Sequence, residues 1–255
     1  MTKQTAPILV LGPMASEIDA LTAALTAPEE TVLGGYRCTA GLLDGVPVVT
    51  VRNLIGMVNA AAATALAAQR FSPRCVIIQG TSGAHDPALH RGDLILGASL
   101  IEMGSYYTPH RDAGAGSGFN DYTFPGVQLA VNGEVERVRT LHSDPALLAI
   151  AEAVPYAHGA RVTGTISSGD IWNRELDVIA RLHRECGSLC EEMEGFAVAQ
   201  VCWMLGLPML AVRVVSNSEW HADEKFDESV GLLCQDYCRR LIAQIDLHFG
   251  EGKQA

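Results

Sequence analysis

The chain has 255 residues, of which 48% are hydrophobic and 18% charged, so it can bury a sizeable core. Its 29 Asp and Glu against 18 Lys and Arg give a formal net charge of −11. That balance argues against a nucleic-acid or anionic-membrane surface, because both need clustered basic side chains. The sequence has no run of apolar residues long enough to predict a transmembrane helix. The seven cysteines are scattered and odd in number, as a reducing compartment permits, so we expect a cytoplasmic protein.

Short β-branched runs alternate with amphipathic segments, which is typical of a buried sheet covered by helices. In chain order the pattern predicts a strand at Ile8–Leu11, a helix at Glu17–Thr26, a strand at Val48–Arg52, a helix at Asn59–Arg70, strands at Cys75–Gln79 and Leu94–Leu100, a helix at Pro145–Val154, a strand at Gly164–Ser168, helices at Glu175–Glu185 and Glu194–Leu205, a strand at Leu210–Val215 and a helix at Glu228–Phe249. No linker or repeat divides the chain. We therefore expect one three-layer α/β/α domain over residues 1–255, with 1–7 and 250–255 as frayed termini.

Most short motifs of known chemistry are absent. There is no P-loop motif, no GxGxxG after a strand and no HExxH. The segment Gly80–Ala84 resembles a nucleophile elbow, but its last residue is Ala and a proline follows closely, which disfavours a serine hydrolase. The pairs Cys186/Cys190 and Cys234/Cys238 have no CxxC or CxxH beside them, so we expect buried thiols and no metal site.

Polar segments follow several of the predicted strands, where open α/β sheets place their ligands. They are Gly12–Glu17, Gln79–Gly83, Ser167–Trp172, Glu191–Gly195 and Arg213–Asn217. Each also has an ordinary structural explanation. Glu17 could be a surface helix residue, Trp172 could be part of the core, and Glu191, Glu192 and Glu194 could form a solvated first turn of a helix.

In their amino-acid sequences and in their order along the chain, these segments resemble the purine nucleoside phosphorylase/nucleosidase superfamily, most closely the 5′-methylthioadenosine/S-adenosylhomocysteine nucleosidases. The most specific pieces are Gly164–Asp170 and Glu192–Gly195 leading into Ala199–Cys202, and the supporting pieces are Ile55–Ala61, Gly80–Asp93 and Phe226–Glu228. The resemblance covers about residues 8–245. It implies a mixed, partly barrel-like sheet and hydrolysis of the N-ribosidic bond of methylthioadenosine or S-adenosylhomocysteine, releasing adenine. It implies no cofactor.

The resemblance also implies a role for each matching residue. Glu17 positions and activates the attacking water, and Thr81 takes the place of a serine beside the water and the ribose. Glu194 grips the ribose hydroxyls, and Trp172 stacks on the base. The other expected contacts are Met193, Ile55 and Met14 on the ribose side and Phe226, Ser216 and Arg213 on the base side. Carboxylates near the sugar suit this chemistry, because bond cleavage develops positive charge on the ribose.

One residue departs from the nucleosidase pattern. Asn217 stands where the family has an aspartic acid that protonates the base, and an amide cannot deliver a proton at neutral pH. In one interpretation Asn217 only donates a hydrogen bond, and the proton comes from water or from a neighbour such as Glu219, His221 or Asp223. In the other, Asn217 marks a 6-oxopurine substrate of the inosine, guanosine or futalosine type.

Two further functions stay open. A phosphorylase needs cationic side chains on its phosphate, but residues 12–17 and 75–83 contain no Arg or Lys, so water is the favoured nucleophile. The other alternative is a non-catalytic nucleoside-binding protein that has lost its acid.

The segment Pro109–Gly126 is irregular and rich in glycine, which fits either a functional loop or a mobile excursion. Relatives of the nucleosidase branch are homodimers in which a partner loop closes the 5′ end of the pocket. The resemblance therefore implies a homodimer. We expect Tyr106–Phe124 to be that loop, with Tyr107, Pro109 or Phe124 near the partner's site.

Overall fold

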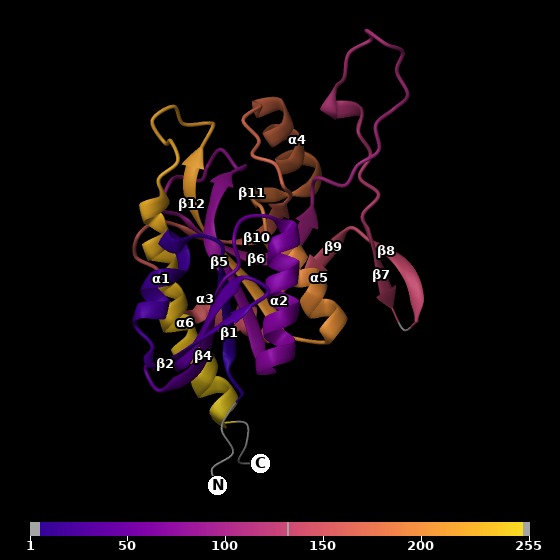
Figure 1. Ribbon diagram of the computed structural model, residues 1–255. Coiled ribbons are helices and arrows are strands. Elements are labelled where there is room, and N and C mark those ends of the chain that lie inside the picture. The colour runs from indigo at the N-terminus through magenta and orange to yellow at the C-terminus, as the bar shows by residue number, and fades with distance from the viewer. Residues whose placement is uncertain (1–5, 132, 252–255) are drawn as a thin grey trace.

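A computed structural model describes residues 6–131 and 133–251 (Figure 1). The expected frayed ends fall largely outside these residues. The main sheet consists of β1 (Ile8–Gly12), β2 (Thr26–Leu33), β3 (Tyr36–Leu43), β4 (Val46–Arg52), β5 (Cys75–Ala84), β6 (Leu94–Glu102), β9 (Thr140–His142), β10 (Arg161–Ser168), β11 (Ser188–Glu192) and β12 (Met209–Ser218). Among the described residues no helix is long and apolar enough to cross a membrane.

The sheet is mixed and partly closed. Its strand order is β11, β10, β6, β12, β5, β1, β4, β3 and β2, and β9 pairs with β6. β11 also pairs antiparallel with β5, so β5, β12, β6, β10 and β11 form a ring. The pairs β1–β5 and β5–β12 are parallel, which brings the carboxyl ends of these three strands to the same edge. The expected mixed, partly barrel-like sheet is confirmed.

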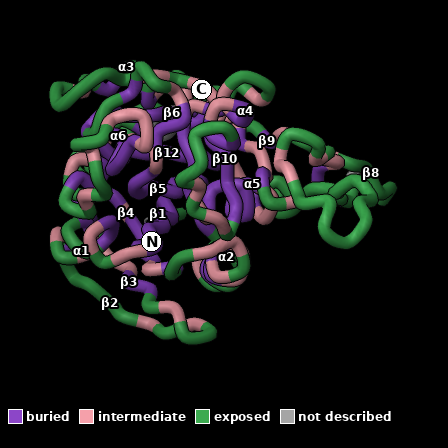
Figure 2. Tube along the Cα trace, turned by 90° about the horizontal axis from the view of Figure 1, so that it is seen from above, coloured by how far each residue is buried: buried purple, intermediate pink, exposed green. Residues whose placement is uncertain are grey.

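Helices cover both faces of this sheet. On one face α2 (Met57–Phe71) and α5 (Gly195–Leu205) pack on the core, and on the other lie α1 (Ala15–Ala23), α3 (Pro145–Ala153) and α6 (Gly231–Glu251). Every residue of β1 and β12 is buried, as expected for strands covered on both sides. Viewed from above, the buried residues gather on the central strands (Figure 2). This confirms the three-layer fold.

Several element boundaries differ from the prediction. The antiparallel pair β2–β3 was not expected, because β2 is largely exposed and its sequence TAPEETVL lacks an apolar run. The predicted first helix ends at Ala23, since Thr26 already begins β2. β11 was missed because it is short and ends in Glu191 and Glu192. The last helix begins at Gly231, after a 3₁₀ turn.

A long excursion leaves the body after β6 and carries the hairpin of β7 (Val127–Val131) and β8 (Glu134–Val138) (Figure 1). The base of its loop is packed on α4 (Leu176–Cys186). Arg181 of α4 donates to the carbonyl of Tyr122 at 2.9 Å and lies 5.2 Å from the ring centroid of Phe119 and 5.5 Å from that of Phe124. The loop therefore has an anchored aromatic base, and Phe124 contacts its own chain.

Candidate active site

One cavity brings together residues from segments far apart in the sequence. It opens where β5, β11 and β12 end, and the loops after β1 and β10 complete it. Its lining includes every predicted site residue except Arg213: Met14, Glu17, Ile55, Thr81, Trp172, Met193, Glu194, Ser216, Asn217 and Phe226. The structure thus brings these predicted residues, from distant parts of the chain, together around one cavity.

Glu17 is fixed at the start of α1, the helix that follows β1. Its Oε2 accepts the backbone N–H of Met14 at 2.9 Å, as the glutamate of a capping box does. Its Oε1 accepts both the backbone N–H and the hydroxyl of Thr81, at 2.7 and 2.8 Å. Glu17 is 1% exposed. Burial raises its pKa, although the charge of Arg213 and the hydrogen bonds from Thr81 oppose the rise.

Glu194 lies directly before α5 and faces the same cavity. Its Oε1 accepts the backbone N–H of Gly56, the residue before α2, at 2.9 Å. Its Oε2 lies 3.5 Å from Nη2 of Arg213. Burial raises the pKa of Glu194 to about 8; the charge of Arg213 opposes this rise, and that of Glu192 adds to it. The solvated turn considered for this acidic segment is wrong, because Glu192 and Glu194 are 6% and 3% exposed.

Arg213 and Glu192 form a buried ion pair behind the cavity wall. Glu192 also accepts the backbone N–H of Glu194 at 3.1 Å and the hydroxyl of Ser168. The guanidinium is thus a single cation that interacts with the charges of Glu17, Glu192 and Glu194. When all three carboxylates are ionised, the cluster has a net negative charge, which favours positive charge developing in the cavity.

The placement of Arg213 corrects the sequence prediction. It was grouped with the base-binding residues, but its side chain is fully buried and does not line the cavity. The reason is its ion pairs, which turn the guanidinium toward Glu192 and Glu194. Gly80 makes room for this arrangement: a Cβ there would stand 2.5 Å from Nη1 of Arg213 and 2.8 Å from Oε1 of Glu17.

Two aromatic side chains, Trp172 and Phe226, also line the cavity. The rings of Trp172 and Phe226 have centroids 5.5 Å apart at an interplanar angle of 64°. Asn217, near the end of β12, has Oδ1 2.9 Å from Oγ of Ser216, which also lies 3.0 Å from the carbonyl of Ser82. The single hydroxyl proton of Ser216 serves only one of these two acceptors, so the direction of the Asn217 amide depends on it.

The sequence prediction missed Glu191. It lines the cavity beside Asn217, is 6% exposed and is held by His85 and Asn173. The available signal was an acidic run directly after the apolar pair Leu189 and Cys190. The three proposed proton donors near Asn217, namely Glu219, His221 and Asp223, do not line the cavity.

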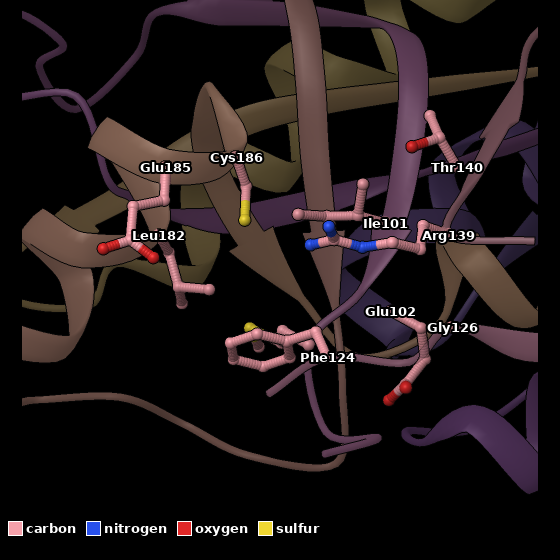
Figure 3. A pocket seen from close by; sticks show the side chains of 10 residues that line it. Ile101, Glu102, Phe124, Gly126, Arg139, Thr140, Leu182, Glu185 and Cys186 are labelled. Atoms are coloured by element: carbon pink, nitrogen blue, oxygen red, sulfur yellow. The ribbon is translucent and has the colours of Figure 1, made fainter. Parts of the chain in front are cut away.

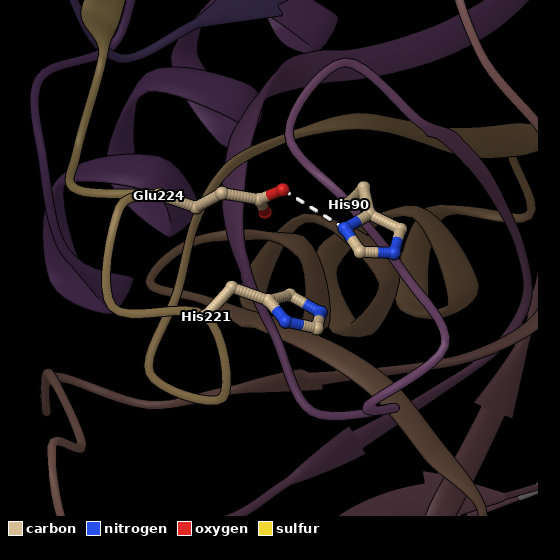
Figure 4. A group of neighbouring side chains, drawn as sticks. All are labelled: His90, His221 and Glu224. Atoms are coloured by element: carbon tan, nitrogen blue, oxygen red, sulfur yellow. Dashed lines mark hydrogen bonds and ion pairs between the residues drawn. The ribbon is translucent and has the colours of Figure 1, made fainter.

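His221 instead belongs to a surface group with His90 and Glu224 (Figure 4). One nitrogen or oxygen atom from each of these three side chains lies within 4.8 Å of the other two. The two rings stack at 4.2 Å, His90 Nδ1 is 2.8 Å from Glu224, and His221 Nε2 is 3.1 Å from the carbonyl of Pro87. These contacts join the loops that follow β5 and β12.

A second cavity lies between α4 and the base of the excursion (Figure 3). Phe124, Arg139, Leu182 and Cys186 are among its lining residues, and none of the predicted site residues is. Of the two cysteine pairs, Cys190, Cys234 and Cys238 are buried as expected, and burial raises the pKa of Cys190 to about 12, whereas Cys186 is only half-buried and lines this second cavity.

Comparison with known proteins shows which family this chain belongs to. The family model of the phosphorylase superfamily matches residues 7–245. The chain belongs to this superfamily. A 5′-methylthioadenosine/S-adenosylhomocysteine nucleosidase of Geobacillus kaustophilus is 30% identical over 210 residues, which cover 82% of this chain and 83% of the relative. Family membership and enzyme class, that of the nucleoside N-glycosyl hydrolases, agree with the sequence prediction.

Two solved structures have the same fold. The Neisseria meningitidis 5′-methylthioadenosine/S-adenosylhomocysteine nucleosidase, in complex with methylthio-immucillin-A, matches with a TM-score of 0.77 and 24% identity, covering 94% of this chain and 99% of that one. The futalosine hydrolase of Helicobacter pylori matches with a TM-score of 0.76 and 22% identity, covering 94% and 98%. At sequence identities this low, these two matches show only that the fold is the same.

Proposed function

We propose that this protein hydrolyses the N-ribosidic bond of a purine nucleoside in the cavity between Glu17 and Glu194. The observation that supports this best is the convergence of these two buried carboxylates, from α1 and from the start of α5, on one cavity. Glu194 accepts hydrogen bonds from the ribose hydroxyls, above Met193. Ile55 and Met14 contact the sugar and its 5′ substituent, and the base lies against Trp172 and Phe226.

In the reaction, Glu17 takes a proton from a water molecule held with the help of Thr81. The water oxygen bonds to the anomeric carbon, and the electron pair of the ribosidic bond leaves with the purine, which then takes a proton from solvent. Asn217 donates a hydrogen bond to the departing base. A positioned general base of this kind contributes about 10²–10⁴-fold to the rate.

Water is the nucleophile rather than phosphate. A phosphate dianion needs Arg or Lys side chains or converging backbone donors. Among the described residues that line the cavity there is no Arg or Lys, and Arg213 behind it is paired with Glu192 and Glu194. Arg52 is paired with Asp19 on the surface.

The named activity of the relatives makes methylthioadenosine and S-adenosylhomocysteine the first candidate substrates. With these substrates the protein would act in methionine salvage. Asn217 favours a second candidate class, the 6-oxopurine nucleosides, because an amide turns its NH₂ toward a 6-oxo group. Free thiols at all seven cysteines support a reducing compartment, the cytoplasm.

Release of free base tests the proposal. Methylthioadenosine, S-adenosylhomocysteine, adenosine, inosine, guanosine and futalosine are incubated with the protein, with and without phosphate. Hydrolysis predicts free base at the same rate in both conditions, whereas a phosphorylase needs phosphate. Binding of a nucleoside without release of base would instead support a non-catalytic binding protein and overturn the proposal.

We further propose that the protein is a homodimer formed through α2 and α5. Both helices expose large apolar side chains: Val58 is 77% exposed, and Met204 and Leu205 are 52% and 53% exposed. Such a patch is typical of an interaction surface. Val58→Glu and Met204→Glu are expected to give monomers in sedimentation, and Val32→Glu on β2 is the control. A fully active wild-type monomer at micromolar concentration would contradict the dimer.

In the dimer, Tyr107 and Pro109 of the loop 106–124 reach toward the partner's site. Both residues are exposed. Phe124 is assigned no such role, because it packs against its own chain near Arg181.

A further inference from the structure

Glu191 is a buried carboxylate at the base end of the cavity. It has no role in the proposed reaction. It is the fourth residue of β11 and pairs in register with Gly83 of β5. Asn217 of β12 pairs with the same Gly83 from the other side. A Cβ on Gly83 would stand 3.2 Å from Nδ2 of Asn217 and 3.7 Å from Cγ of Glu191. The carboxylate and the amide therefore face the same space.

Three nitrogen atoms lie within hydrogen-bond distance of the Glu191 carboxylate, and all three are donors in the tautomer of His85 whose Nδ1 accepts the hydroxyl of Ser188. The backbone N–H of Asn173 lies 2.7 Å from Oε1, the Asn173 amide Nδ2 lies 2.5 Å from Oε2, and Nε2 of His85 lies 3.0 Å from Oε2. A carboxylate has about four acceptor positions, so one is left, on Oε1. Because Glu191 lines the cavity, this position is available to a ligand. Trp172, the residue before Asn173, lines the same cavity as Glu191.

His85 is itself fixed. It is fully buried, its Nδ1 is 2.8 Å from Oγ of Ser188, and its carbonyl accepts the indole N–H of Trp220 at 3.0 Å. Ser188 in turn accepts the hydroxyl of Ser167 at 2.7 Å. A buried network of this kind holds a polar side chain in one geometry and is costly to leave incomplete. It orients Glu191 before any ligand binds.

We propose that Glu191 and Asn217 select a 6-oxopurine base, with His85 as the positioning residue for Glu191; this rests on the proposed nucleosidase function. A 6-oxopurine presents an N1–H donor next to the O6 and N7 acceptors, whereas adenine presents an N1 acceptor next to an amino group. The free position of Glu191 accepts N1–H, and the NH₂ of Asn217 donates to O6 and N7. Adenine would set its N1 lone pair against the carboxylate, and Asn173 N–H, the neighbouring donor, is already occupied by Glu191.

Two matched substrate pairs test this inference: inosine with adenosine, and 5′-methylthioinosine with 5′-methylthioadenosine. Within each pair only the base differs, so any preference for the 5′ group cancels. We expect kcat/KM to favour the 6-oxo member by about 100-fold or more, because an unmatched buried polar group is strongly rejected. Glu191→Gln, whose amide presents a donor or an acceptor, reduces this ratio by about 10-fold or more. Asn217→Asp shifts the preference toward 6-aminopurines. Glu136→Gln, on the exposed hairpin, is the control.

The role of His85 is tested by the same ratio. His85→Gln keeps a donor toward Glu191 and retains the preference, whereas His85→Phe loses it; a merely structural role would lower both substrates equally. Calorimetry with free hypoxanthine and adenine gives a readout independent of turnover. Wild-type protein that prefers 6-aminopurines, or a ratio unchanged in Glu191→Gln, overturns the inference. If no nucleoside releases base, the proposed function fails, while tighter binding of hypoxanthine than of adenine that Glu191→Gln abolishes still supports the role of Glu191.

Discussion

Thr81 donates two hydrogen bonds to the same oxygen of Glu17, one from its backbone N–H at 2.7 Å and one from its hydroxyl at 2.8 Å. Both bonds stabilise the ionised carboxylate, and both oppose the rise in pKa that burial causes. The hydroxyl bond is the one that a mutation can remove without changing the backbone.

We expect Thr81→Val to move the acidic limb of the pH–rate profile to higher pH. Glu17 acts as a base only when ionised, so activity is lost as the pH falls through its raised pKa. Removal of the hydroxyl bond raises this pKa further. Thr81→Ser keeps the hydroxyl and is the matched control. A profile in Thr81→Val identical to that of the wild type would show that Glu17 is not the group that titrates.

At pH 9, above the pKa of about 8 that burial gives Glu194, Glu194→Gln is expected to lower turnover by about 10²-fold or more, because the neutral amide holds the ribose hydroxyls less strongly than the ionised carboxylate and no longer favours positive charge on the sugar. The measurement is kcat for free-base release, with folding checked by circular dichroism. Glu136→Gln, exposed on β8, should retain wild-type kcat. Equal activity of the two variants would remove Glu194 from the mechanism.

The residues that line the cavity could be predicted from the sequence because most of their segments lie at or just after the carboxyl ends of strands, in the order of the family that they resemble. What could not be predicted is the direction of individual side chains. Arg213 was placed at the base, but the burial of Glu192 and Glu194 draws its guanidinium behind the sugar end. Glu191 was given no role in the site, since the pairing of β11 with β5, which buries it, joins segments more than 100 residues apart. Such closure of a sheet leaves no local pattern.

The raised pKa of Glu194 makes the free energy of unfolding depend on pH. Its pKa is about 8 in the folded protein against an ordinary 4.5, so the native state binds the proton more tightly than the unfolded chain. This contribution is fully present below pH 4.5 and is lost as the pH rises through 8, at no more than about 1.4 kcal/mol per pH unit. Denaturant titrations between pH 5 and 8.5 should therefore show the wild type losing stability relative to Glu194→Gln. A constant difference between the two proteins would contradict the raised pKa.

Gly80→Ala tests the close approach of Arg213 and Glu17. The new methyl group would stand 2.5 Å from Nη1 of Arg213 and 2.8 Å from Oε1 of Glu17, so one of these groups must move. Because both are buried and bonded, we expect a loss of about 1–3 kcal/mol in the free energy of unfolding and a large loss of kcat. The control for backbone strain is Gly45→Ala, because φ is also positive there (+89°, against +157° at Gly80) and no atom lies within 4 Å of the new methyl group. Stability and kcat that match those of the control would mean that the space beside Gly80 is not needed for the ion-pair cluster.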